Sequence, residues 1–143
     1  MPQQPIDQPG LRLRMSGESR RISSQHRQLD AIYSRIVAAL ERGAERDARD
    51  ALQRFRDAWD AHTSLEDGFY FPALRGLRPE LASELDSLSS EHDRFRVELG
   101  ELERLFKDAA AERATALERF ATNVATHEGR EERLLAGITG GAA

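Results

Sequence analysis

The sequence predicts an all-α protein, an up-down-up-down four-helix bundle, and three observations point to it. Apolar residues recur at three- and four-residue steps through four long segments, which is the period of an amphipathic helix. Short connections separate these segments, and no stretch alternates between apolar and polar residues as a half-buried strand would. The 143 residues suffice for one domain with a sizeable core. Four such helices pack as antiparallel neighbours.

The domain boundaries follow from a change in composition near the N-terminus. Residues 1–16 carry much Pro and Gln, and we expect them to form a flexible N-terminal arm. Leu11 and Leu13 are candidates to anchor the end of this arm on the bundle. We expect the bundle itself over residues 17–137 and a frayed tail over residues 138–143.

Turn signals place the first two helices. The first is predicted from about Glu18 to a C-cap signal at Gly43, and the second begins at about Glu45. Gly68 and Pro72 should weaken or kink the second helix near its end. The apolar stripe of the first helix comprises Ile22, Leu29, Ile32, Tyr33, Ile36, Val37 and Leu40.

The last two helices are predicted from about Pro79 to Ala110 and from about Ala111 to Leu135. Pro79 suits the first turn of a helix because its missing N–H has no helical partner there. The third stripe comprises Leu81, Leu85, Leu88, Phe95, Leu99, Leu102 and Phe106. No strong cap marks the boundary between these two helices near residue 111.

Composition excludes several classes of function. The net charge of −4 is modest and both signs are mixed along the chain, so we expect neither a nucleic-acid nor a membrane partner. The absence of cysteine excludes disulfides, iron–sulfur clusters and thiolate zinc sites. No apolar run reaches the roughly 20 residues of a transmembrane helix, and no signal peptide is visible, so we expect a cytoplasmic protein. Twenty arginines against a single lysine, Lys107, suggest a bacterium of high GC content.

The four histidines fall into two matching half-patterns. Each half-pattern is a lone His followed, 35 or 36 residues later, by His-x-x-x-Glu. Residues four apart on a helix lie on the same face, so each imidazole and its carboxylate can reach the same ion. Equivalent positions are 65 or 66 residues apart, which suggests two similar helical hairpins related by a pseudo-twofold axis. The residues are His26, His62 and Glu66, then His92, His127 and Glu131.

All four histidines lie on apolar stripes and therefore point inward. Burying four imidazoles and two carboxylates in a leucine-rich core would cost several kcal/mol for each unpaired carboxylate. A metal centre removes this cost because every polar atom then has a partner. A set of N and O donors without sulfur suits iron, manganese or zinc, and two carboxylates one turn from two histidines can bridge a pair of ions.

Two familiar metal centres fit less well. Ferritin-like di-iron proteins use Glu-x-x-His, but the residues three before each histidine are Ser23, Trp59, Ser89 and Val124. That spacing excludes the family, and we interpret Trp59 as a packing residue. A haem held by two histidines would leave the other two histidines and both glutamates unexplained.

The combined pattern resembles the hemerythrin-like, or HHE cation-binding, domain. The resemblance covers roughly residues 18–136 and includes the acidic-to-Phe-Pro segment Glu66 to Leu74. It implies a non-haem di-iron centre with an oxo or hydroxo bridge. By the family pattern, one iron is bound by His26 and His62, and the other by His92 and His127. The two glutamates, Glu66 and Glu131, span both ions.

The sequence departs from oxygen-carrying hemerythrins at one informative position. Their third helix carries His-x-x-x-His, whereas Arg96 stands four residues after His92 here. Their last ligand is an Asp five residues after the final histidine, in place of Glu131. One iron therefore lacks a protein ligand, which favours redox chemistry at an open position over simple oxygen carriage. Tyr70 and Tyr33 are candidates to complete the coordination, and each is otherwise an aromatic at the edge of the core.

Two further residues have alternative interpretations. Arg96 either brings positive charge near an anionic ligand or extends outward to solvent. Asp30, four residues after His26, either orients that imidazole or is a solvated surface charge.

Two classes of function remain open on these grounds. The first is a di-iron protein that binds or reacts with O₂, peroxide or nitric oxide in oxidative or nitrosative stress defence, with catalase-like peroxide disproportionation among its activities. The second is an iron- or oxygen-responsive regulatory module that a partner protein reads out. Iron storage is disfavoured because nothing in the sequence indicates the oligomeric cage that storage needs.

Overall fold

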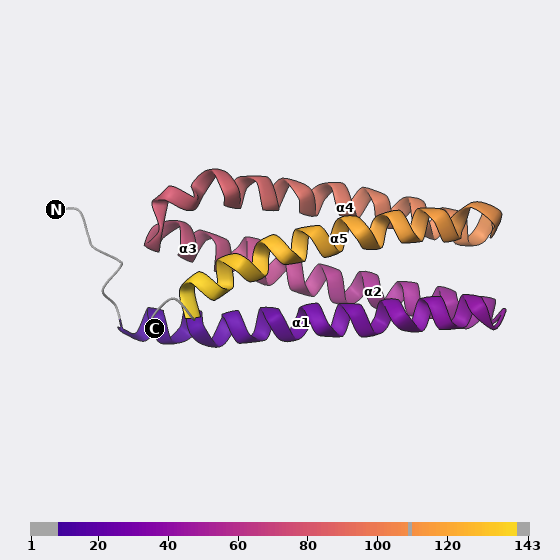
Figure 1. Ribbon diagram of the computed structural model, residues 1–143, viewed down its shortest axis with the longest axis horizontal. Helices are drawn as coiled ribbons and strands as arrows, with labels where there is room; N and C mark the ends of the chain where they lie inside the picture. Colours follow the sequence, from indigo (N-terminus) through magenta and orange to yellow (C-terminus); the bar gives the residue numbers. More distant parts are fainter. Residues whose placement is uncertain (1–8, 109, 140–143) are drawn as a thin grey trace.

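Long antiparallel helices build the whole of the structure, a computed structural model that describes residues 9–108 and 110–139. The second helical rod is continuous through three segments, so the described chain forms four rods and contains no strand. Figure 1 shows these rods side by side, which confirms the predicted all-α bundle. The elements in chain order are α1 (Pro9–Glu41), α2 (Glu45–Leu65), a π-helix (Glu66–Tyr70), α3 (Phe71–Leu77), a 3-10 turn (Pro79–Leu81), α4 (Ala82–Asp108) and α5 (Ala110–Thr139).

The first helix starts earlier than the sequence suggested. Residues 9–16 belong to α1 and Met15 is fully buried, so this part of the expected arm is a packed helix. Leu11 packs against the neighbouring apolar residues as expected, but Leu13 is 74% exposed and anchors nothing. Residues 1–8 and 140–143, the rest of the expected arm and most of the expected tail, lie outside the described residues.

The turn between α1 and α2 depends on one glycine. Gly43 has a φ of 73°, the left-handed conformation that glycine adopts without steric cost, as the C-cap signal predicted. The N–H of Ala44 then donates to the carbonyl of Ala39, which satisfies a backbone acceptor at the end of α1. The chain thus reverses within a few residues.

The predicted irregularity in the second rod is a π-helical turn. At its end the N–H of Phe71 donates to the carbonyl of Glu66, five residues back rather than four. Pro72 follows directly and has no N–H, so a regular helical bond to Gly68 cannot form there. The wider turn keeps Glu66, Tyr70 and Phe71 all buried on the inner side of the bundle.

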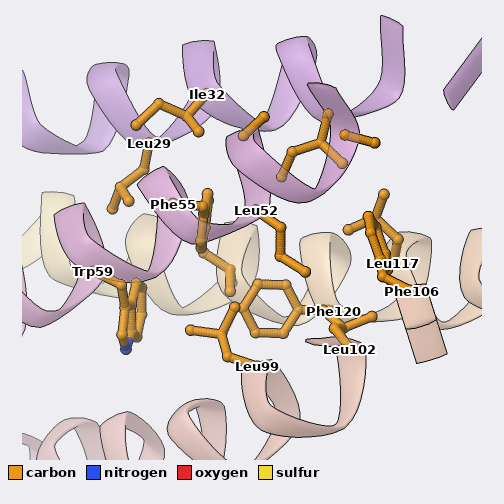
Figure 2. Packing of buried hydrophobic residues seen from close by; sticks show 14 of the residues in the cluster. Leu29, Ile32, Leu52, Phe55, Trp59, Leu99, Leu102, Phe106, Leu117 and Phe120 are labelled. Carbon is orange, nitrogen blue, oxygen red and sulfur yellow. The ribbon is translucent and has the colours of Figure 1, made fainter. Parts of the chain in front are cut away.

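Two apolar clusters fill the core. The large apolar cluster draws on all four rods, and Figure 2 shows its labelled side chains in the space between the helices. It comprises Leu29, Ile32, Ile36, Ala39, Ala48, Ala51, Leu52, Phe55, Trp59, Phe95, Leu99, Leu102, Phe106, Leu117, Phe120 and Val124. The small apolar cluster lies near the chain ends and comprises Met15, Ile22, Tyr70, Phe71, Leu74, Leu85, Leu88 and Leu135.

Between the two clusters every rod contributes polar residues to one layer. On α1, for example, His26 lies between Ile22 of the small cluster and Leu29 of the large one. Within the described ranges, no helix has both the length and the apolarity needed to cross a membrane.

Candidate metal centre

The polar layer contains all six residues of the histidine–glutamate pattern, each almost fully buried. Their exposed fractions do not exceed 4%, so the inward orientation predicted from the apolar stripes is confirmed. The pattern assigns one histidine to each rod and the two glutamates to the second and fourth rods. The residues are His26 on α1, His62 and Glu66 on the second rod, His92 on α4, and His127 and Glu131 on α5.

The Nε2 atoms of the four imidazoles converge on the two carboxylates. Glu131 is the common partner: its oxygens lie 2.9 Å from Nε2 of His26 and 3.0 Å from Nε2 of His127. The same carboxylate is 3.6 Å from Nε2 of His62 and 3.4 Å from Nε2 of His92. Glu66 Oε1 lies 3.0 Å from Nε2 of His92 and 3.3 Å from Nε2 of His62.

The Nδ1 atoms all point the other way and form hydrogen bonds to oxygens of four polar side chains, which we call the outer ring. His26 Nδ1 bonds to Glu132 at 2.6 Å, and His62 Nδ1 to Gln25 at 2.8 Å. The outer ring consists of Gln25, Asp67, Glu91 and Glu132.

The other half of the outer ring is built the same way. His92 Nδ1 bonds to Asp67 at 3.0 Å, and His127 Nδ1 to Glu91 at 2.6 Å. With a proton on each Nδ1, bonded to these oxygens, the Nε2 lone pairs would be free to face a metal ion at the centre, which is the arrangement that metal-binding histidines adopt.

The outer ring was not predicted, although the sequence carries a signal for it. Each member is adjacent in sequence to an inward residue of its own rod but supports the histidine of the next rod around the bundle. A step of one residue turns a side chain by about 100° around a helix, from the core toward a neighbouring helix. Gln25 and Glu91 precede an inward residue, whereas Asp67 and Glu132 follow one, because alternate rods run in opposite directions.

Burial and the neighbouring charges distribute protons unevenly over this layer. Burial opposes a charge on His92, but hydrogen bonds to Asp67 and Glu131 and the charge of Glu66 outweigh it and raise the pKa of His92 to about 11. Burial, with repulsion from His26 and His92, lowers the pKa of His62 despite the opposing effect of Glu131. The layer without metal therefore has a charged His92 and a neutral His62.

The two glutamates also differ in protonation. Burial and the charge of Glu131 raise the pKa of Glu66 well above its usual value. Burial also opposes ionisation of Glu131, but its hydrogen bonds to the imidazoles lower the pKa well below the usual value. Of the two buried carboxyl groups, Glu131 therefore favours the ionised form and Glu66 the protonated form.

The layer offers donor atoms that protein groups alone do not satisfy. His62 Nε2 and Glu66 Oε1 are fully buried, and neither makes a hydrogen bond within the described residues. Buried polar atoms without partners are rare and costly. Two overlapping sets of four donors are present, and within each set the donor atoms lie within 4.8 Å of one another. One set is His26, His62, Glu66 and Glu131, and the other is Glu66, His92, His127 and Glu131.

The two tyrosines considered as additional ligands occupy other environments. The hydroxyl of Tyr70 is hydrogen-bonded to Ser19, and burial raises the pKa of the phenol. Tyr33 lines a groove of about 510 Å³ between α1 and α5, where its charged neighbour is Glu118. The structure therefore places Tyr70 in the small apolar cluster and Tyr33 beside the large one.

Arg96 and Asp30 lie at the periphery of the site. The guanidinium of Arg96 contacts Asp93 and reaches Asp67 at 3.9 Å, so it touches the outer ring and leaves the inner donors alone. Asp30 is exposed, as its surface interpretation predicted, and Glu132 is the acid that contacts Nδ1 of His26.

Glu128 is a buried acid that the sequence analysis did not single out. It is 8% exposed, and burial raises its pKa to about 8, an effect that His26 opposes and that Asp30 and Glu131 reinforce.

The fold and this layer define a helical-bundle protein with a buried histidine–carboxylate centre. The family model of the hemerythrin HHE cation-binding domain matches residues 18–138, and the chain belongs to this family. No curated protein and no solved structure matches the chain. Family membership agrees with the resemblance carried by the histidine–glutamate pattern, and it implies that the site binds a cation, with iron favoured.

Proposed function

We propose that this chain is a non-haem di-iron protein that binds or reacts with O₂, peroxide or nitric oxide at an open iron position, in defence against oxidative or nitrosative stress. One observation supports this most strongly. Four Nε2 atoms face two shared carboxylates in two overlapping sets of four donors. Such an arrangement provides two ion positions with the same ligand types, joined by the two glutamates.

The proposed ligand set follows from these two groups. His26 and His62 hold one ion, His92 and His127 hold the other, and Glu66 and Glu131 serve both. Imidazole and carboxylate donors without sulfur suit iron. Bound iron, with an oxo or hydroxo bridge, would supply the redox chemistry; the polypeptide supplies orientation and a dry environment.

Aromatic side chains of both apolar clusters pack against the histidines of the layer and exclude water from it. The ring of Trp59 packs against those of His62, His92 and His127, with centroid separations of 5.9–6.3 Å. Phe71 stacks on His92 at 5.7 Å, on the side of the small apolar cluster. These contacts fix the imidazole planes while the outer ring fixes their Nδ1 atoms.

The proposed open position rests on the absence of a fifth histidine. Arg96, one helical turn beyond His92, directs its guanidinium to Asp93, Asp67 and Thr63. The Tyr70 hydroxyl is already bonded to Ser19. Neither group donates to the centre, so each ion would have two imidazoles and the shared carboxylates as its protein ligands, and a small ligand would complete the coordination.

Elemental analysis with an optical spectrum of iron-loaded protein tests the proposal. We expect two iron ions per chain and the near-ultraviolet absorption of a bridged di-iron centre, with no Soret band. A His62→Ala/His92→Ala double variant removes one imidazole from each ion and should lose the iron, whereas the exposed substitution Gln28→Ala should retain it. Fewer than two ions in the wild type, or equal iron in all three proteins, would refute the proposal.

The alternative, an iron- or oxygen-responsive module, gains no specific support. A docking partner would favour an extended exposed apolar patch. Among the described side chains, the large exposed hydrophobic residues are Leu13 on α1 and Val97 on α4.

A further inference from the structure

The outer ring is not symmetric, although the bundle nearly is. Positions 25 and 91 are equivalent in the two half-patterns, since each directly precedes the lone histidine of its half. Each also bonds to Nδ1 of the histidine in the following rod, Gln25 to His62 and Glu91 to His127. A neutral amide therefore stands on one side where a carboxylate stands on the other.

The carboxylate side is also the better anchored. Glu91 accepts a hydrogen bond of 2.6 Å from Nη1 of Arg130, whose Nε donates to Glu84 at 3.1 Å. Glu91 is thereby held against His127 by a chain of charged partners from α4 and α5. Within the described residues Gln25 has the single side-chain partner His62.

The difference acts directly on the donor strength of the imidazoles. A carboxylate that accepts the Nδ1–H bond makes the other ring nitrogen more basic and fixes the orientation of the ring. A neutral amide acceptor makes a weaker bond than a charged one. Outer partners of this kind typically change metal affinity by about 10- to 100-fold.

We infer that the two ion positions differ in affinity, and that the ion held by His26 and His62 is the weaker, later-loaded and more readily exchanged one because Gln25 interrupts the ring of carboxylates. The inference rests on the proposed function, since it concerns the two ions of that centre. The inner donors of the two positions are the same in kind and number, so this difference arises from the outer ring.

The test is a titration of the metal-free protein with Co²⁺, followed by calorimetry and by visible absorption. Wild type should bind two ions with constants that, corrected for the protons released on loading, differ by about tenfold or more. Gln25→Glu completes the ring and should strengthen the weaker constant about tenfold, leaving the tighter one unchanged. Gln28→Glu places the same charge on the exposed side of α1, three residues away, and should change neither constant.

The reciprocal substitution tests the other half. Glu91→Gln should weaken the tighter constant by a similar factor, so that the two constants converge. Glu84→Gln also removes a partner of Arg130 but leaves the bond to His127 in place, and it should retain the tight ion. In His62→Ala the remaining ion should bind with the tighter constant, and in His127→Ala with the weaker one.

The outcomes separate this inference from the function it rests on. Failure to bind any Co²⁺ would overturn both. Two ions of equal affinity in the wild type, or equal effects of Gln25→Glu and Gln28→Glu, would overturn the asymmetry while leaving the two-ion centre intact.

Discussion

The large apolar cluster and the polar layer occupy adjacent parts of the same bundle, but they are stabilised in different ways. In the large apolar cluster, contacts are non-directional and shared among sixteen residues. In the polar layer the contacts are directional and involve individual atoms, and Glu131 alone lies within 3.6 Å of all four imidazoles. The large apolar cluster can therefore lose one side chain and remain an apolar core, whereas metal binding by the polar layer depends on individual donor atoms.

The largest expected effect comes from removing the carboxylate at the centre of the polar layer. Glu131→Ala removes a donor that both ion positions share, so the variant should lose both ions and with them the difference in melting temperature between metal-loaded and metal-free protein. That difference should be large in the wild type, because an ion present at a thousand times its dissociation constant adds about 4 kcal/mol. Melting followed by circular dichroism, with and without iron, measures it.

The matched control lies in the large apolar cluster. Leu102→Ala should cost about 2–5 kcal/mol in both the metal-loaded and the metal-free protein, because it deletes buried apolar volume away from the layer. The metal-dependent difference in melting temperature should persist. If Glu131→Ala keeps that difference, or if Leu102→Ala removes it, the polar layer and the large apolar cluster do not contribute separately to stability.

The contrast also explains what could be predicted from the sequence. Apolar periodicity is repeated many times along each rod, so the helices and the inward direction of His26 or His92 followed from neighbours such as Leu29 and Phe95. The start of α1 was placed too late because the arm was judged by composition, whereas Met15 packs into the small apolar cluster.

Which histidine each outer-ring residue supports could not be predicted from the sequence, for a geometric reason. Gln25 supports a histidine 37 residues away, and Glu132 one 106 residues away, so neither pair has a short-range signature. Asp30 has the helical spacing to His26 that a local rule favours, yet it is exposed. Only the order of the rods around the bundle determines which neighbour each outer residue faces.

An effect of intermediate size is the pH dependence of metal binding to the polar layer. The raised pKa of His92, about 11, lies above its unfolded value near 6.5, so the metal-free site holds this proton at neutral pH. A metal ion must displace it. Loading should therefore release protons, and apparent affinity should fall about tenfold per displaced proton for each unit by which pH is lowered.

Calorimetry in buffers of different ionisation enthalpy counts the released protons. Asp67→Asn removes a hydrogen-bonded carboxylate that raises the pKa of His92, so fewer protons should be released in this variant. Asp93→Asn changes an exposed acid on the same helix and should release as many as the wild type. Proton release that is zero, or equal in all three proteins, would contradict the proton assignment.

The smallest expected effect on stability comes from Arg96, at the edge of the layer. Its ion pairs with Asp93 and Asp67 are partly exposed, so Arg96→His should change the free energy of unfolding by less than about 1 kcal/mol. The substitution nevertheless places an imidazole one turn beyond His92, the spacing that oxygen-carrying hemerythrins use. A fifth nitrogen donor should occupy the open position, slow peroxide turnover and prolong the binding of O₂.

The measurement is oxygen release from peroxide by iron-loaded wild type, Arg96→His and Arg94→His. Arg94 is an exposed residue on the same helix, so Arg94→His is the control. Equal rates in all three proteins would show that the position facing residue 96 is not where peroxide reacts.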